Sequence, residues 1–131
     1  MTGGPTEAGR PDAGGGPIVG PARGSLVAAG GGALGPEIWE RFVALAGGDT
    51  SRIVVVPTAG TGPEPSGARA VAALEAAGAS RVVVLHTRDA GVADTDSFAA
   101  PLRSATGVWF PGGRQWRLVE AYAGTRTLAE V

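Results

Sequence analysis

Cysteine is absent from this chain of 131 residues, which excludes disulfides, thiolate metal sites and a cysteine nucleophile. Histidine occurs once, as His86, so the chain cannot build a metal site from a cluster of histidines. Lysine is also absent, and the 11 basic residues, all arginine, against 12 acidic residues leave a net charge of −1. This charge gives no general attraction to nucleic acid or to an anionic membrane, so neither is expected as a partner. No apolar run approaches the length that spans a bilayer.

The first 24 residues, MTGGPTEAGRPDAGGGPIVGPARG, are rich in glycine and proline and poor in large apolar side chains. This composition predicts a flexible tail over residues 1–24, without the apolar core of a secretory signal. Residues 25–131 are expected to be the folded part, with the cytoplasm as the default location. A content of 44% hydrophobic and 18% charged residues is typical of a soluble globular protein.

Short apolar runs alternate with amphipathic stretches along the folded part. Their β-branched content, without polar alternation, is typical of strands that are buried on both faces of a parallel sheet. Four runs are predicted strands: SLVAAG (25–30), RIVVVP (52–57), RVVVLH (81–86) and GVWFP (107–111). The alternation with helices predicts an α/β fold with a doubly wound, flavodoxin-like, mostly parallel sheet.

Proline and glycine mark the predicted helix ends. Pro36 suits the first turn of a helix, and Gly78 and Gly124 suit the position just after a last turn. Pro101 is costly beyond a first turn, so the helix within residues 95–105 is predicted to begin late, with Pro101 near its start.

Ligands of doubly wound sheets bind at the carboxyl ends of the strands. Four loops lie there: residues 30–35, 58–65, 86–94 and 111–114. The first residues of two of these loops are expected to be structural. Thr58 is expected to cap the following turn, and His86 to be a histidine with satisfied hydrogen bonds.

The sequence PGGRQ at 111–115 is the sharpest signal among these loops. Gly112 and Gly113 leave backbone N–H groups unshielded, which suits an oxyanion-binding turn. Gln115 can offer a carbonyl and an amide to a substrate, and Arg114 is suited to a carboxylate. On the residues alone, a plain turn whose polar side chains face water explains the pattern equally well.

The sequence GGGALG at 30–35 fits the dinucleotide fingerprint G-x-G-x-x-G through Gly30, Gly32 and Gly35. A Rossmann-like nucleotide-binding module is therefore an alternative function. It lacks the acidic residue expected at the end of the second strand, where Thr58 and Ala59 stand instead. A tight turn without a ligand, or a glycine loop that another substrate approaches, are the other interpretations.

The segments GSLVAAGGGA, RIVVVPTAG, AGASRVVVLHTRD and ATGVWFPGGRQWRLVEAYAGT occur in the order and spacing of the cyanophycinase family. From about Gly24 to its end the chain resembles this family of serine peptidases, which are related to the α-aspartyl dipeptidases and share a fold with class I glutamine amidotransferases. The resemblance implies the N-terminal part of an enzyme that removes β-aspartyl-arginine dipeptides from cyanophycin through an acyl-enzyme. It also implies that no metal or organic cofactor is needed.

The resemblance assigns roles to the glycine turn. One amide, of Gly112 or Gly113, helps to form the oxyanion hole, and Gln115 lines the substrate pocket. Arg114 is placed with the substrate-binding residues, although many family members carry an aspartate at that position.

Gly31 and Gly32 match the first glycine loop of the family, which faces the same cleft. The family's nucleophilic serine lies on a later strand-to-helix elbow, its histidine and acid follow, and His86 does not match that histidine. The 131-residue chain by itself is therefore expected to be inactive and to fold poorly. A non-catalytic remnant of the peptidase fold is a further alternative, and a homodimer of the full-length protein is compatible with the peptidase interpretation. The serines that lie outside any such elbow are Ser25, Ser51, Ser66, Ser80, Ser97 and Ser104.

Overall fold

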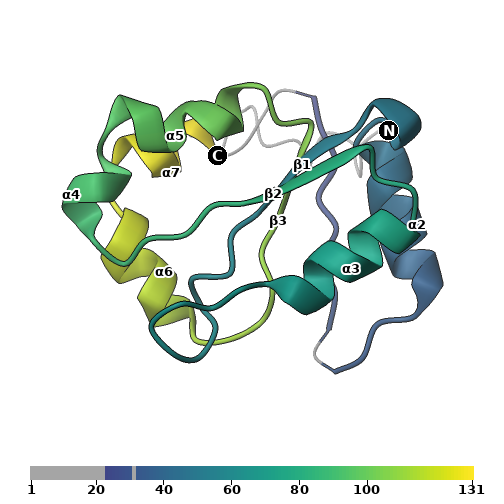
Figure 1. Cartoon of the computed structure of the whole chain (residues 1–131), viewed down its shortest axis with the longest axis horizontal. Helices are drawn as coiled ribbons and strands as arrows, with labels where there is room; N and C mark the ends of the chain where they lie inside the picture. Colours follow the sequence, from purple (N-terminus) through teal and green to yellow (C-terminus); the bar gives the residue numbers. More distant parts are fainter. Residues whose placement is uncertain (1–22, 31) are drawn as a thin grey trace, which may run out of the picture.

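Three parallel strands form the sheet of this protein in a computed structural model that describes residues 23–30 and 32–131 (Figure 1). The strands are β1 (Arg52–Val55), β2 (Arg81–Val84) and β3 (Gly107–Trp109), and their order across the sheet is β2-β1-β3. In the central strand, Ile53 lies opposite Val82 on one side and Gly107 on the other. Because both pairs are parallel, each connection between strands crosses over the sheet, as the predicted fold requires.

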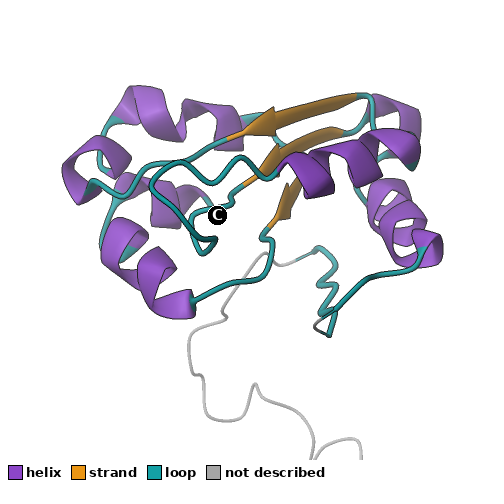
Figure 2. Ribbon diagram, turned by 60° about the horizontal axis from the view of Figure 1, so that its bottom comes forward, coloured by secondary structure: helices purple, strands orange, loops and turns teal. Residues whose placement is uncertain are grey.

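Helices cover both faces of the sheet (Figures 1 and 2). Along β1 the side chains alternate between the faces: Ile53 and Val55 pack with residues of two helices, and Val54 and Val56 pack with the others. This double coverage confirms the doubly wound α/β class. The first face carries α2 (Pro36–Leu45) and α3 (Ala68–Ala76), the second carries α4 (Ala90–Ala93), α5 (Asp96–Arg103), α6 (Gln115–Tyr122) and α7 (Arg126–Glu130), and η2 (Gly48–Thr50) precedes β1.

Several helix ends lie where the sequence predicts them. Pro36 is the first residue of α2, and Gly78 (φ 101°) and Gly124 (φ 72°) follow α3 and α6 in the left-handed region that glycine favours. Within residues 23–30 and 32–131, no helix combines the length and the apolar character needed to cross a bilayer.

The prediction of a strand at residues 25–30 is wrong. This segment has no regular secondary structure, and Leu26, its largest apolar side chain, is 92% exposed. The segment and β3 line the same open hollow, and no backbone ladder joins them. Its remaining residues are small, so pairing would bury little apolar surface against the cost of ordering a glycine-rich chain.

The expected position of Pro101 is also wrong. α5 begins at Asp96 and contains Pro101 as its sixth residue, beyond the first turn. The start is fixed by Thr95, whose hydroxyl accepts a hydrogen bond from the Phe98 N–H (3.3 Å). Burial of Ala99 and Leu102 against the sheet offsets the helical hydrogen bond that proline removes.

Candidate functional site

The ends of the three strands bring three of the predicted loops together. Each strand ends two residues earlier than the sequence predicts. The two residues that follow each strand therefore belong to the loops after β1, β2 and β3. The loop after β1 lies at the centre: the Ala59 carbonyl accepts a hydrogen bond from the Arg114 N–H (2.9 Å) after β3. The carboxyl edge of the sheet is therefore one connected structure, as expected for a doubly wound fold.

The glycine turn packs directly against the loop after β1. A Cβ atom on Gly113 would lie 2.1 Å from the Ala59 carbonyl oxygen, and the φ of Gly113 is 149°. Only glycine fits this contact without displacing the backbone. By contrast, a Cβ on Gly112 would meet no atom within 4 Å.

The amides of this turn are available to a ligand. Gly112 and Gly113 are exposed, and no residue that the structure describes accepts a hydrogen bond from either N–H. The turn leads into α6, whose eight residues start at Gln115. The N-terminal end of a helix carries partial positive charge, so the turn presents donors in an environment that favours a negatively charged oxygen.

Gln115 and Arg114 lie beside these amides. Arg114 is the N-cap residue of α6, its side chain makes no capping hydrogen bond, and both side chains are exposed. Both residues thus lie directly after the glycine turn, and their roles in binding stay predictions.

Gly32 lines the same open hollow as Gly112, together with residues of β3. Its φ of 93° lies in the region that favours glycine, and Gly31 lies outside the described residues. Because no strand forms at residues 25–30, the glycine-rich stretch lacks the strand that precedes a dinucleotide fingerprint. The nucleotide-binding alternative is therefore not favoured.

A hydrogen-bond network that is buried at Thr58 and Tyr122 joins the loops behind the turn. The His86 Nε2 lies 3.2 Å from the Pro63 carbonyl, which can only accept, so Nε2 donates this bond and, in the neutral imidazole, Nδ1 is left as an acceptor. The Thr58 hydroxyl therefore donates to His86 Nδ1 (2.9 Å), and Tyr122 donates to Thr58 (2.6 Å). The Thr87 N–H completes the chain by donating to the Tyr122 oxygen (3.3 Å).

These partners confirm that His86 is structural and correct the expectation for Thr58. The Thr58 hydroxyl does not cap its own turn, because it is fully buried and bonded to residues that follow β2 and β3. A sequence pattern shows local capping partners but not partners 28 and 64 residues away.

Thr58→Val is expected to destabilise the protein by about 1–3 kcal/mol, because the buried Tyr122 hydroxyl loses its acceptor while the side-chain volume stays the same. Tyr122→Phe is the matched control: it removes the donor and leaves the bond between Thr58 and His86 in place. Urea titration measures both. Equal stability of wild type and Thr58→Val would contradict the network.

Two arginines that the sequence analysis did not single out hold the loop after β1. Arg88, which follows β2, donates to the carbonyls of Thr58 (3.1 Å) and Gly60 (2.7 Å). Arg117 of α6 donates to the carbonyls of Ala59 (3.3 Å) and Gly60. The only signal in the sequence is that Arg88 stands two residues after a predicted strand, in a position where loop residues meet.

Other charged groups of the described residues serve the fold. Arg103 bridges Asp96 (2.6 Å) of α5 and Glu130 (3.0 Å) of α7. The hydrogen bond from Arg103 lowers the pKa of Asp96 and, with the bond to Glu130, raises the pKa of Arg103. In the described part of the chain, no group of three histidine, cysteine or acidic residues could hold a metal ion.

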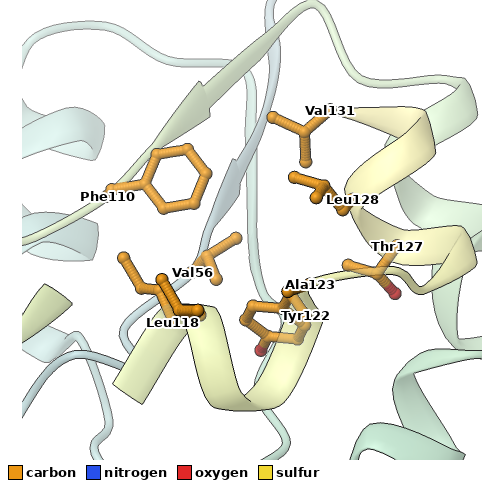
Figure 3. Close-up of a pocket in the computed structure, with 9 residues that line it drawn as sticks. Val56, Phe110, Leu118, Tyr122, Ala123, Thr127, Leu128 and Val131 are labelled. Carbon is orange, nitrogen blue, oxygen red and sulfur yellow. The ribbon is translucent and has the colours of Figure 1, made fainter. Parts of the chain in front are cut away.

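An apolar cavity of about 300 Å³ opens between α6 and α7 (Figure 3). Its two hydroxyl-bearing residues are engaged elsewhere, since Thr127 donates to the Ala93 carbonyl (2.7 Å) and Tyr122 belongs to the hydrogen-bond network. The cavity therefore offers no polar group for chemistry. Its walls are formed by Val56, Phe110, Leu118, Val119, Tyr122, Ala123, Thr127, Leu128 and Val131.

A stretch of 91 residues, which is 70% of the chain, is similar in sequence to two curated proteins. Each is 31% identical to it there, and each is a cyanophycinase, from Trichormus variabilis and from a Nostoc species. Over these 91 residues the chain is similar to cyanophycinases. The match covers 30% of each cyanophycinase, so this chain spans less than a third of the length of these relatives. No protein-family model matches it.

Proposed function

We propose that the glycine turn is the oxyanion-binding element of a cyanophycinase-like serine hydrolase that releases β-aspartyl-arginine dipeptides from cyanophycin. The observation that carries this proposal is the pair of exposed amides at Gly112 and Gly113, which have no acceptor among the described residues and lie at the start of α6. The similarity to cyanophycinases supports the class of reaction.

In this reaction a serine hydroxyl attacks the carbonyl carbon of the substrate while a histidine takes its proton. The carbonyl oxygen then gains negative charge, and amides that point at its new position lower the barrier. Collapse of the tetrahedral intermediate expels the amine and leaves an acyl-enzyme, which water hydrolyses. The turn would supply only the amides, because no serine of the 131 residues lies in a nucleophile elbow and His86 is committed to Thr58 and Pro63.

The test is hydrolysis of cyanophycin by the protein expressed from its complete reading frame. Release of β-aspartyl-arginine dipeptide supports the proposal, and trapping of an acyl-enzyme on serine supports the mechanism. No hydrolysis of cyanophycin would overturn the proposal. A non-catalytic remnant of the peptidase fold would then explain the turn better.

Gln115→Ala is expected to raise the KM for cyanophycin several-fold, with little change in kcat. An exposed amide side chain beside the turn would contribute binding that is equal in the ground state and the transition state. Steady-state kinetics separates the two constants. A fall in kcat at constant KM would show that Gln115 acts in the transition state instead, and would overturn its assignment to the substrate pocket.

A further inference from the structure

The guanidinium group of Arg88 ties three carbonyls of the loop after β1 into one unit. It donates to Thr58 (3.1 Å), to Gly60 (2.7 Å) and to Gly62. A guanidinium group carries five N–H donors in a fixed plane, so it can hold several carbonyls in a defined arrangement, whereas a lysine offers a single charged nitrogen. Arg88 thereby fixes the path of a loop that has no regular secondary structure.

The same loop forms the wall against which the glycine turn rests. Ala59, between two of the residues whose carbonyls Arg88 holds, accepts from the Arg114 N–H (2.9 Å) and touches Gly113. Because Gly113 lies too close to Ala59 for a Cβ atom and the next residue is hydrogen-bonded to Ala59, a shift of the loop would be transmitted to the turn. Arg88 is thus connected to the turn through a single layer of backbone.

Arg117 closes the arrangement from the side of α6. Its guanidinium group donates to the Ala59 and Gly60 carbonyls, so the Gly60 carbonyl accepts from both arginines. The Gly60 carbonyl therefore connects three parts of the structure: the loop after β1, the loop after β2 and α6. Two positive groups at this point also add to the field that favours an oxyanion at the neighbouring turn.

We infer that Arg88 is a positioning residue for the oxyanion-binding turn and acts through the carbonyls of Thr58, Gly60 and Gly62. The inference rests on the proposed function of the turn. Among the residues that the structure describes, the Arg88 side chain donates hydrogen bonds only to this loop, so its loss should affect the rate of the chemical step more than the binding of substrate.

The experiment compares Arg88→Ala and Arg88→Lys with the wild type in the protein expressed from its complete reading frame. Amide hydrogen exchange at the Arg114 N–H reports on the loop contact directly, and kcat and KM for cyanophycin hydrolysis report on the turn. In Arg88→Ala we expect about tenfold faster exchange at Arg114 and about a tenfold lower kcat, with KM changed less than about twofold, since small misplacements of aligned groups are costly. Arg88→Lys should restore little of the slow exchange or of kcat, because lysine lacks the planar set of N–H donors of a guanidinium group.

Two controls isolate the effect. Arg41→Ala removes an exposed arginine of α2 that makes no side-chain hydrogen bond among the described residues, and it should change neither readout. Exchange at the Val56 N–H, which donates to the Trp109 carbonyl (2.9 Å), should stay slow in all variants and thereby show an intact sheet.

Each outcome has a defined consequence. Unchanged exchange at Arg114 in Arg88→Ala overturns the inference whatever the activity, and faster exchange with an unchanged kcat overturns the link to catalysis. Full recovery of kcat by lysine would show that only the charge matters and would overturn positioning by the guanidinium group. A wild-type protein without any hydrolysis overturns the proposed function, while the exchange result still decides whether Arg88 holds the turn.

Discussion

Gly113→Val is expected to lower kcat for cyanophycin hydrolysis by about 10²–10³-fold, the range found when one oxyanion donor is lost. The side chain would place Cβ 2.1 Å from the Ala59 carbonyl oxygen, in a φ region that β-branched residues avoid. The turn must therefore move away from Ala59, and its amides no longer point at the position of the oxyanion. Steady-state kinetics on the protein expressed from its complete reading frame measures the effect.

Gly112→Ala is the matched control for this prediction. Its Cβ meets nothing within 4 Å, and its φ is not positive, so the backbone and both amides should stay in place and kcat should change less than about threefold. Circular dichroism separates loss of catalysis from loss of folding, and Gly113→Ala repeats the test with a smaller side chain. Wild-type turnover by Gly113→Val would refute the oxyanion assignment.

Trp109→Ala is expected to destabilise the protein by about 3–5 kcal/mol, the cost of deleting a large buried aromatic side chain. Trp109 ends β3 and is 8% exposed. Its ring centroid lies 4.4 Å from that of Trp39 and 5.0 Å from that of Phe42, both on α2. Trp109 therefore packs α2 against β3, the strand that precedes the glycine turn.

Trp116→Ala provides the comparison, because Trp116 is 53% exposed and its ring lies beside the guanidinium group of its neighbour Arg117, 5.3 Å from the ring centroid. Its removal should cost less than about 1 kcal/mol. Urea titrations with equal m values for the wild type and both variants give the free energies of unfolding. A similar cost for the two tryptophans would contradict the packing of β3 against α2.

The described core reflects the sequence closely. The runs of β-branched residues at 53–55 and 82–84 form parallel strands, because such runs lose stability unless they are covered by other elements. The central run is buried, whereas β2 lies at an edge of the sheet and its Val84 is 44% exposed. Pro36, Gly78 and Gly124 mark helix ends because their backbone preferences are local and need no partner. The glycine turn at the end of β3 was predictable for the same reason.

Local patterns failed where distant contacts compete with them. The residues at 25–30 look like a strand, yet the structure gives them no strand partner and little to bury. Pro101 lies well inside α5 because the cap at Thr95 and the burial of Leu102 outweigh its local preference. In both cases the deciding energy comes from contacts that the sequence does not display.

By itself, the sequence determined the α/β class, the parallel strands and the location of a glycine turn with unshielded amides, since these follow from residue size, backbone freedom and periodicity. Only the tertiary structure decided what surrounds that turn. The contact of Gly113 with Ala59, the three carbonyls held by Arg88 and the bond between Thr58 and Tyr122 each join residues far apart in the chain. Hydrogen bonds of this kind depend on the relative placement of whole strands, and folding alone fixes that placement.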